Sequence, residues 1–317
     1  MTANLAVLPG EVGRVRLADR LMPPAPQGQD VLLRMGYAPI NPADLLAIDG
    51  LYSFNLPHDE PLGAEGSAVV EAVGEAVTDL RPGDWVMPLS RGNWCRYRLL
   101  PRQDVVPLPA GIELRQGAML RINPPTAHLL LRNAGVGRGD AIVQNGAGSV
   151  VARWVRAFAS RMDVAVIDIL RRPDPALPDA LIDGDDLAER ARAAVGDRPI
   201  RAALDCVAGD ATGRLARCLS PGGRLLLFGH LSGDPIAVQS QLLTGNGLSI
   251  IGFSLRPAET ALGEDGVHTL FADLAVLHAA DPPSLPIRAV MPVSQADQAV
   301  AFARQAGAGR VLIDLSA

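Results

Sequence analysis

Lysine is absent from this chain of 317 residues, in which all 29 basic residues are arginine. Without a lysine amine, no mechanism through a Schiff base on the protein is open to it. Cysteine is also scarce, because Cys95, Cys206 and Cys218 lie far apart and form no CxxC pair. This pattern argues against a disulfide framework and against a four-cysteine zinc lobe.

Long apolar runs and an excess of basic charge are missing too. No stretch approaches the ~18 apolar residues that a membrane span needs, and the first residues lack the basic and apolar pattern of a signal peptide. The net charge is −5, which gives no electrostatic reason for nucleic-acid binding. We therefore expect a soluble, cytoplasmic protein that uses neither a membrane nor a nucleic acid.

Apolar residues make up 48% of the chain, enough for a substantial core, and their pattern changes along it. Near the start they form short runs such as 31–35 and 67–73, separated by turns, which predicts a small β-barrel-like domain. The last part resembles the first, with strands predicted over 287–292 and 310–315 around a helix over 294–306.

The middle of the chain alternates strands with helices. Buried strands are predicted over 141–144, 164–169, 202–206, 224–229 and 248–253, and helices over 149–161 and 187–195. Alternation of this kind is typical of a doubly wound parallel sheet. The sequence therefore predicts an α/β protein with a Rossmann sheet beside the β-barrel domain.

A glycine-rich bend follows the first strand of this middle part. The segment Gly146-Ala147-Gly148-Ser149-Val150 joins that strand to a helix, although the third glycine of a GxGxxG pattern is replaced. Glycines allow the backbone to approach a pyrophosphate, and the helix N-terminus offers it free N–H groups. We interpret the bend as a dinucleotide site, and a plain strand–turn–helix remains the alternative.

The choice of nicotinamide cofactor depends on the residues after the second strand. Asp168 lies near the spacing of a ribose-binding acid, which would favour NAD(H). Arg171 and Arg172 follow, and two guanidinium groups suit the 2′-phosphate of NADP(H), unless they form a solvated loop. We favour NADP(H), with NAD(H) as the alternative.

Six motifs are spread over the chain. They are Asn41-Pro42-Ala43-Asp44, Ile48-Asp49-Gly50-Leu51-Tyr52, Pro61-Leu62-Gly63-Ala64-Glu65-Gly66, Arg81-Pro82-Gly83-Asp84, Ile122-Asn123-Pro124-Pro125-Thr126-Ala127 and Gly309-Arg310-Val311-Leu312. These motifs resemble those of the zinc-independent medium-chain dehydrogenases/reductases, and within them the mitochondrial type of enoyl-thioester reductase. Quinone oxidoreductases share many of the same motifs.

The resemblance implies a chaperonin-10-like catalytic domain over 1–118 and 279–317 and a Rossmann domain over 119–278. It also implies a homodimer, for which the strand 248–253 suits edge-to-edge pairing of sheets. Zinc-bearing relatives have a cysteine and a histidine where this chain has Asn41 and Ala64. The resemblance therefore implies a site without metal.

The implied reaction is NADPH-dependent reduction of the C=C bond of an enoyl-CoA or acyl-carrier thioester. Tyr52 is our candidate donor for the charge on the carbonyl oxygen or for the proton, since a phenol with a pKa of ~10 stays protonated. Asn41 and Thr126 are expected to position the nicotinamide or the Tyr52 hydroxyl. The resemblance adds as cofactor contacts Asn123, Phe228, Gly229, Phe253, Leu255 and Arg310.

Each of these residues also has an interpretation that is structural and not functional. Tyr52 could pack under its loop, Asn41 could be a turn residue before proline, Asn123 could cap a helix, and Phe253 could belong to the core. Two other functions also remain open: a reductase of free quinones or enones, and a nicotinamide-binding protein without turnover.

Overall fold

The computed structural model describes residues 4–51, 58–108, 110–280, 283, 285–305, 307 and 309–317, without the side chains of 275–280. The chain divides into two compact units. Unit 1 comprises Met1–Ile122 and His268–Ala317, and unit 2 comprises Asn123–Val267. Among the described residues, no helix combines the length and the apolar character that crossing a membrane requires.

Unit 2 is built on a sheet of parallel strands in the order β10-β9-β8-β11-β12-β13. The strands are β8 (Ala141–Gln144), β9 (Ala165–Leu170), β10 (Leu181–Ile182), β11 (Ile200–Asp205), β12 (Arg224–Leu227) and β13 (Ser249–Gly252). The central strands β8 and β11 are mostly apolar and, apart from Arg201, buried, as is typical of parallel strands between helices.

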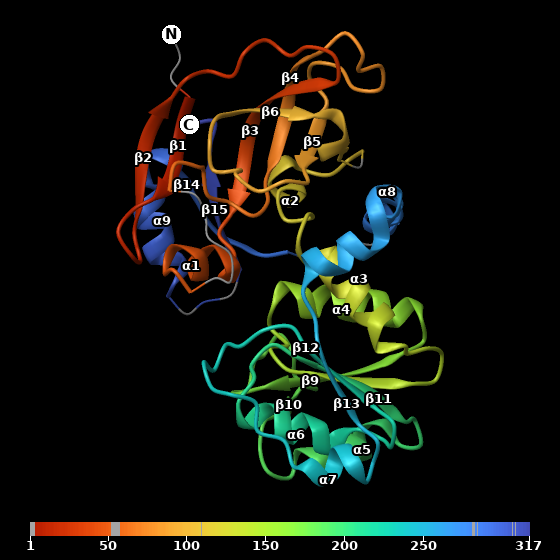
Figure 1. Cartoon of the computed structure of the whole chain (residues 1–317). Helices are drawn as coiled ribbons and strands as arrows, with labels where there is room; N and C mark the ends of the chain where they lie inside the picture. Colours follow the sequence, from red (N-terminus) through yellow and green to blue (C-terminus); the bar gives the residue numbers. More distant parts are fainter. Residues whose placement is uncertain are drawn as a thin grey trace. The chain divides into compact units, whose positions relative to one another are not determined.

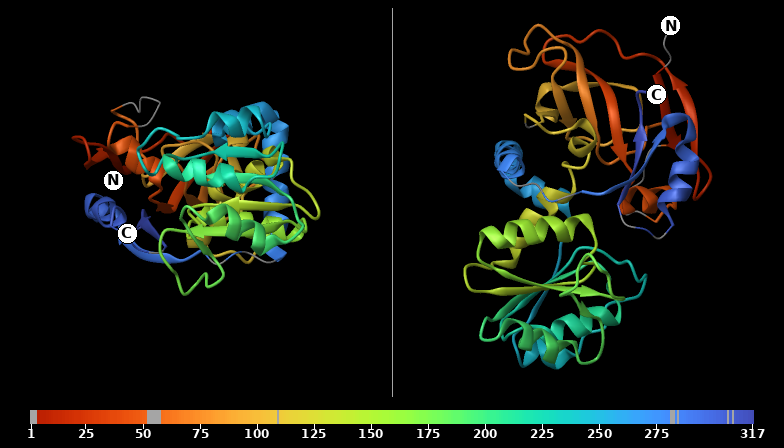
Figure 2. Two further views of the ribbon diagram at one scale, coloured as in Figure 1. Left: turned by 90° about the horizontal axis from the view of Figure 1, so that it is seen from below. Right: turned by 180° about the vertical axis from the view of Figure 1, so that it is seen from behind.

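Helices cover both faces of this sheet (Figures 1 and 2). One face carries α3 (Asn123–Ala134) and α4 (Val150–Arg161), and the other carries α5 (Leu187–Val195), α6 (Asp210–Cys218) and α7 (Ser240–Thr244). α4 packs through Trp154, Val155 and Phe158, which share one face of the helix and are buried. The predicted doubly wound parallel sheet is confirmed.

Unit 1 holds a mixed, mainly antiparallel sheet in the order β14-β15-β3-β4-β5-β7, with β6 also pairing with β3. A separate two-stranded ribbon joins β1 (Asn4–Pro9) and β2 (Val15–Arg20). The sheet strands are β3 (Asp30–Pro39), β4 (Ser67–Val73), β5 (Trp85–Pro88), β6 (Tyr97–Pro101), β7 (Val105–Pro107), β14 (Ile287–Pro292) and β15 (Arg310–Asp314).

The helices of unit 1 are short. They are α1 (Pro42–Ile48), α2 (Leu114–Gly117) and α9 (Ala296–Ala303), while α8 (Leu255–Ala280) continues from unit 2 and is interrupted at Gly263. The helix predicted over 294–306 is shorter in the structure, because a 3-10 turn over Val293–Gln295 takes its first residues and Arg304 ends it. Leu33, Met35, Trp94 and Ile313 belong to the buried core of the unit.

Candidate functional site

In unit 2, the predicted cofactor residues that follow strands lie at one edge of the sheet, because the carboxyl ends of parallel strands lie together. Gly146, Gly148, Ser149 and Val150 follow β8; Arg171 and Arg172 follow β9; Phe228 and Gly229 follow β12; Phe253 follows β13, and Leu255 begins α8. This edge is where nucleotides bind in open α/β sheets.

Gly146 makes the sharp bend after β8. Its φ is +60°, in the left-handed region, and a Cβ there would lie 2.4 Å from the Cys206 Sγ atom. At Gly148, no other heavy atom lies within 4 Å of the position of a Cβ, so that the backbone is open to a ligand. The bend thus requires glycine at 146 and gives close access at 148.

The bend leads directly into the N-terminus of α4. Ser149 is the N-cap, and its Oγ atom accepts a hydrogen bond from the Ala152 N–H at 3.1 Å. The N–H groups of Val150 and Val151 have no partner within the helix, and the helix dipole adds partial positive charge there. The Val150 side chain is buried, so its part in the site is its backbone N–H. These features fit a pyrophosphate.

Asp168 already has partners within unit 2. Its Oδ1 atom accepts hydrogen bonds from Gln144 Nε2 at 2.7 Å and from Arg156 Nη1 at 2.9 Å. Arg156 also donates to the carbonyl oxygen of Ala147 in the glycine bend, at 3.0 Å. The Asp168 charge is therefore balanced inside the fold, which weakens the argument for NAD(H).

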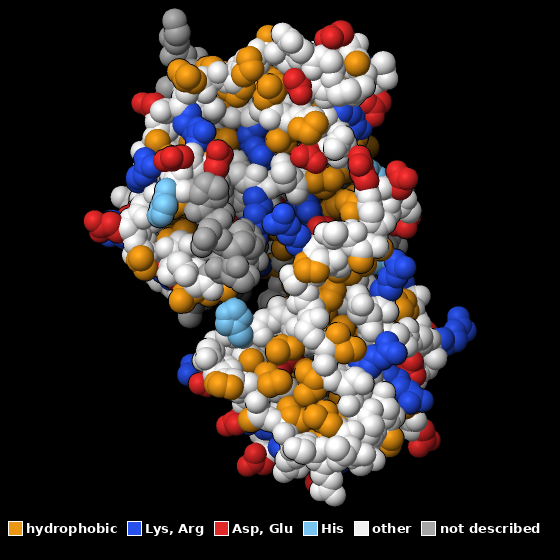
Figure 3. Space-filling model, in the orientation of Figure 1, with side chains coloured by type: hydrophobic (Ala, Val, Ile, Leu, Met, Phe, Trp, Pro, Cys, Tyr) orange, Lys and Arg blue, Asp and Glu red, His pale blue; other side chains and the backbone are white. Residues whose placement is uncertain are grey.

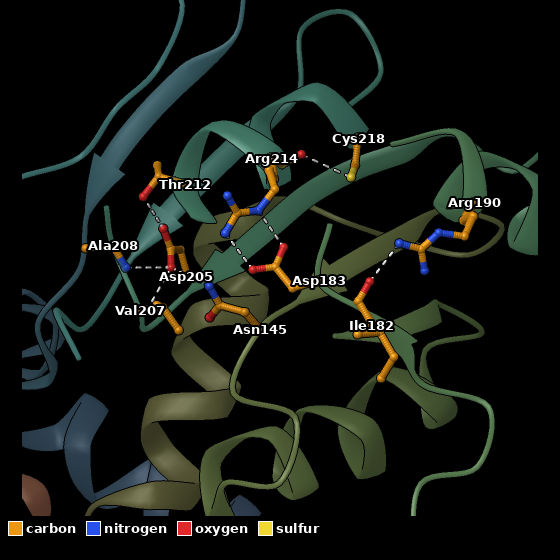
Figure 4. A network of polar contacts seen from close by, with 10 residues as sticks. All are labelled: Asn145, Ile182, Asp183, Arg190, Asp205, Val207, Ala208, Thr212, Arg214 and Cys218. Atoms are coloured by element: carbon orange, nitrogen blue, oxygen red, sulfur yellow. Dashed lines mark hydrogen bonds and ion pairs between the residues drawn. The ribbon is translucent and has the colours of Figure 1, made fainter. Parts of the chain in front are cut away.

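A buried carboxylate lies beside the bend, at the end of β11, in a network that the sequence did not reveal (Figure 4). Asp205 Oδ1 accepts hydrogen bonds from Asn145 Nδ2 at 2.6 Å, from Val207 N–H at 2.9 Å and from Ala208 N–H at 3.0 Å. Asp205 Oδ2 accepts one from the Thr212 hydroxyl at 2.6 Å. Four donors thus satisfy one fully buried carboxylate.

This network shapes the loop that supports the glycine bend. Ala208 has a φ of +68°, which is rare for a residue other than glycine. The hydrogen bond from its N–H to Asp205 stabilises this conformation. Cys206 N–H donates to Asn145 Oδ1 at 2.8 Å, and a Cβ at Gly229 would lie 2.6 Å from the Cys206 carbonyl oxygen. Burial raises the pKa of the Cys206 thiol to about 12, so it packs as a neutral group.

In unit 1, Asn41 belongs to a buried polar cluster with Glu65. Asn41 Nδ2 donates to Glu65 Oε1 at 3.0 Å, and the Ile122 N–H donates to Glu65 Oε2 at 2.9 Å. Burial raises the pKa of Glu65 to about 7, although the Asn41 hydrogen bond and the Arg310 charge act in the opposite direction. The predicted residues Asn41 and Arg310 therefore share a carboxylate neighbour.

A second carboxylate in this cluster, Asp44, ties α1 to the segment before β4. Asp44 accepts hydrogen bonds from the N–H groups of Asn41 at 2.9 Å and Ala64 at 3.0 Å. Burial also raises the pKa of Asp44, against these bonds and the charges of Arg91 and Arg310. Asp44 and Glu65 each belong to one of the sequence motifs, but the motifs did not predict the hydrogen bonds that these two carboxylates accept.

The remaining predicted residues belong to unit 2 or lie outside the structure's described part. Asn123 and Thr126 are buried in the first turn of α3, which belongs to unit 2. Tyr52 lies outside the described residues. Among the residues that are described, no group of three or more His, Cys, Asp or Glu side chains could hold a metal ion.

The comparisons with known proteins agree with this arrangement. Residues 27–119 match the family of the alcohol dehydrogenase GroES-like domain. The mitochondrial enoyl-acyl-carrier-protein reductase of Mus musculus is 35% identical over 262 residues, which cover 78% of this chain and 70% of that protein. The same enzyme of Homo sapiens is 34% identical over 247 residues, 73% of this chain and 66% of that protein.

Solved structures of low identity share the whole fold. The mitochondrial 2-enoyl thioester reductase heterodimer Etr1p/Etr2p of Candida tropicalis has a TM-score of 0.84 at 22% identity, over 99% of this chain and 100% of that one. A Bacillus thuringiensis structure assigned as an NADPH:quinone reductase has a TM-score of 0.88 at 23% identity, over 99% of each chain.

A GroES-like unit joined to a dinucleotide-binding sheet defines a class, that of the medium-chain dehydrogenases and reductases. The chain belongs to this family, together with the mitochondrial enoyl-acyl-carrier-protein reductases. The family predicted from the motifs is confirmed.

Proposed function

We propose that this protein reduces the C=C bond of a 2-enoyl thioester with NADPH. The observation that carries the proposal is the identity of 35% to a curated enoyl reductase over 78% of the chain. A fold neighbour, Etr1p, was solved in a complex with NADP and crotonyl-CoA, which supports the same cofactor and substrate class. When bound, NADPH supplies the hydride that the β-carbon of the substrate receives.

The residues of unit 2 bind and orient the dinucleotide in this proposal. The bend at Gly146 and Gly148 and the N-terminus of α4 receive the pyrophosphate. Arg171 and Arg172 are exposed directly after β9 and receive the 2′-phosphate, since the nearby Asp168 charge is balanced by Arg156.

In this proposal, unit 1 supplies the groups that stabilise the developing negative charge and donate the proton. Reduction of the double bond places negative charge on the thioester oxygen and requires a proton at the α-carbon. Tyr52 is the proposed donor, and Asn41, held by Glu65, is a proposed positioning group. Thr126, in the first turn of α3, is proposed to orient the nicotinamide.

The test is NADPH oxidation with crotonyl-CoA, a long-chain enoyl thioester and a free quinone, measured side by side. We expect turnover with a thioester and a loss of about 100-fold or more in kcat for Tyr52→Phe. Unchanged turnover of Tyr52→Phe removes the role of Tyr52. Turnover with the quinone alone favours the alternative of a quinone reductase, and NADPH binding without turnover favours a non-catalytic binding protein.

We further propose that the reaction proceeds without zinc. By the resemblance of their motifs, Asn41 and Ala64 correspond to positions that hold zinc ligands in zinc-bearing relatives, and neither an amide nor a methyl group is a good zinc ligand. Metal analysis of the purified active protein tests this. An equimolar zinc content that is needed for turnover contradicts the proposal.

A homodimer through the edge of the unit 2 sheet completes the proposal. β13 pairs with β12 alone among the described strands, and Ile251 on it is 37% exposed. Figure 3 shows hydrophobic side chains gathered on unit 2 in the region where Figure 1 labels β13. Sedimentation of the wild type and of Ile251→Arg tests it: a dimeric mass that the substitution lowers supports this interface, and a monomeric wild type contradicts it.

A further inference from the structure

One carboxylate in unit 1 holds two segments that contain or adjoin predicted site residues. Glu65 Oε1 accepts a hydrogen bond from the Asn41 side chain, and Glu65 Oε2 accepts one from the Ile122 backbone. Ile122 directly precedes Asn123, the first residue of α3. Glu65 is fully buried, so water does not replace either bond.

We propose that Glu65 is a positioning residue, whose ionised carboxylate holds the Asn41 amide in one orientation and keeps the Ile122 backbone in place during the reductase reaction. The inference rests on the proposed function. Each Glu65 oxygen already accepts a hydrogen bond from the protein, so we assign Glu65 a role through Asn41 and not as a proton donor to substrate.

The charge state of Glu65 sets the strength of both bonds. An ionised carboxylate accepts strongly at both oxygens, whereas protonation places a hydrogen on one oxygen and weakens that oxygen as an acceptor. The charged groups that act on Glu65 are Arg310, which favours the ionised form, and Asp44, which opposes it; Arg91 in turn acts on Asp44. Because burial places the pKa of Glu65 at about 7, we expect turnover to rise as pH increases through neutrality.

Glu65→Gln is the direct test, because its amide presents one acceptor and one donor to two N–H groups. We expect kcat to fall on the order of tenfold and its dependence on pH near neutrality to disappear. NADPH affinity, measured by fluorescence, should stay within about threefold, since the glycine bend and the arginines proposed to bind the pyrophosphate and the 2′-phosphate lie in unit 2. Hydrogen exchange in a peptide that contains Ile122 should become faster.

Two further variants make the test specific. Glu71→Gln removes the same charge from an exposed side chain on β4, which pairs with Arg34, and should behave as wild type. In the double variant Asn41→Asp/Glu65→Gln, the amide at 65 can donate to the carboxylate at 41 and accept from the Ile122 N–H. Slow exchange at Ile122 should therefore return in the double variant.

Wild-type kcat and pH dependence in Glu65→Gln overturn the positioning role. Unchanged exchange at Ile122 in that variant, or no recovery in the double variant, overturns the hydrogen-bonding arrangement on which the role depends. If the wild type reduces no enoyl thioester, the proposed function fails, and the exchange measurement still decides whether Glu65 holds Ile122.

Discussion

Buried carboxylates organise both units, but their surroundings differ. In unit 2, Asp205 receives four hydrogen bonds from amide and hydroxyl donors. In unit 1, Glu65 and Asp44 receive two each and lie near the charge of Arg310, and burial raises the pKa of both. Unit 2 thus fixes its loop with neutral donors, whereas unit 1 keeps a balance of charges that responds to pH.

The largest effect that this comparison predicts is at Asp205. Asp205→Ala leaves four donors, three of them in buried hydrogen bonds, without their acceptor, so we expect the free energy of unfolding to fall by about 4 kcal/mol, measured by chemical denaturation. NADPH affinity should fall with it, because the loop supports the Gly146 bend. Asp197→Ala, at an exposed aspartate of the same unit, is the control. A decrease of less than about 1 kcal/mol in the free energy of unfolding would contradict the stabilising role that distinguishes Asp205 from the carboxylates of unit 1.

The next effect is a dependence of stability on pH that comes from Glu65. Between pH 4.5, the ordinary pKa of this carboxyl, and about 7, the folded protein keeps a proton on Glu65 that the unfolded chain has released. Stability therefore falls as pH rises through this window, by about 3 kcal/mol from this group. Denaturation curves at several pH values should show a smaller fall for Glu65→Gln. Equal slopes for the two proteins would contradict a raised pKa of Glu65.

A smaller effect concerns charge on the surface of unit 2. The double substitution Arg171→Ala/Arg172→Ala should weaken NADPH binding about tenfold and leave NADH binding within about twofold, because only NADPH has the 2′-phosphate. Titration with both cofactors measures this, and NADH is the internal control. An equal loss for both cofactors would place these arginines elsewhere than at the 2′-phosphate.

The smallest effect is at the cap of α4. Ser149→Ala removes the acceptor of the Ala152 N–H and should cost about 1 kcal/mol, seen as a lower Tm. Ser149→Thr keeps a hydroxyl at the cap and should retain most of the stability. If Ser149→Ala and Ser149→Thr have the same Tm, the hydroxyl at the cap does not contribute to stability.

Local patterns predicted much of the fold. The bounds of α5 and β14 match the prediction, because each element has clear periodicity between turn residues. The two-residue strand β10 gave no such signal, and neither α6 nor the interrupted α8 was predicted. The shorter α9 shows that a local pattern does not distinguish an α-helix from a 3-10 turn at its start.

The candidate site was predicted only where its residues form a motif. The glycine bend follows from its place between a strand and a helix. The partners of Glu65 and Asp205 do not, because Ile122 is 57 residues from Glu65 and Asn145 is 60 residues from Asp205. Polar residues at the ends of buried strands, such as Asp205 in β11, are the signal that could have pointed to this network.

The two units become complete at different points during synthesis of the chain. Unit 2 is one continuous stretch, Asn123–Val267, whereas the sheet of unit 1 needs β15, which pairs with β3, and β14, which pairs with β15, and both follow unit 2 in the chain. A nascent chain can therefore complete its nucleotide-binding half while the first half still has an open sheet edge beside β3. Until β15 is made, that edge of β3 is exposed to pairing with other chains.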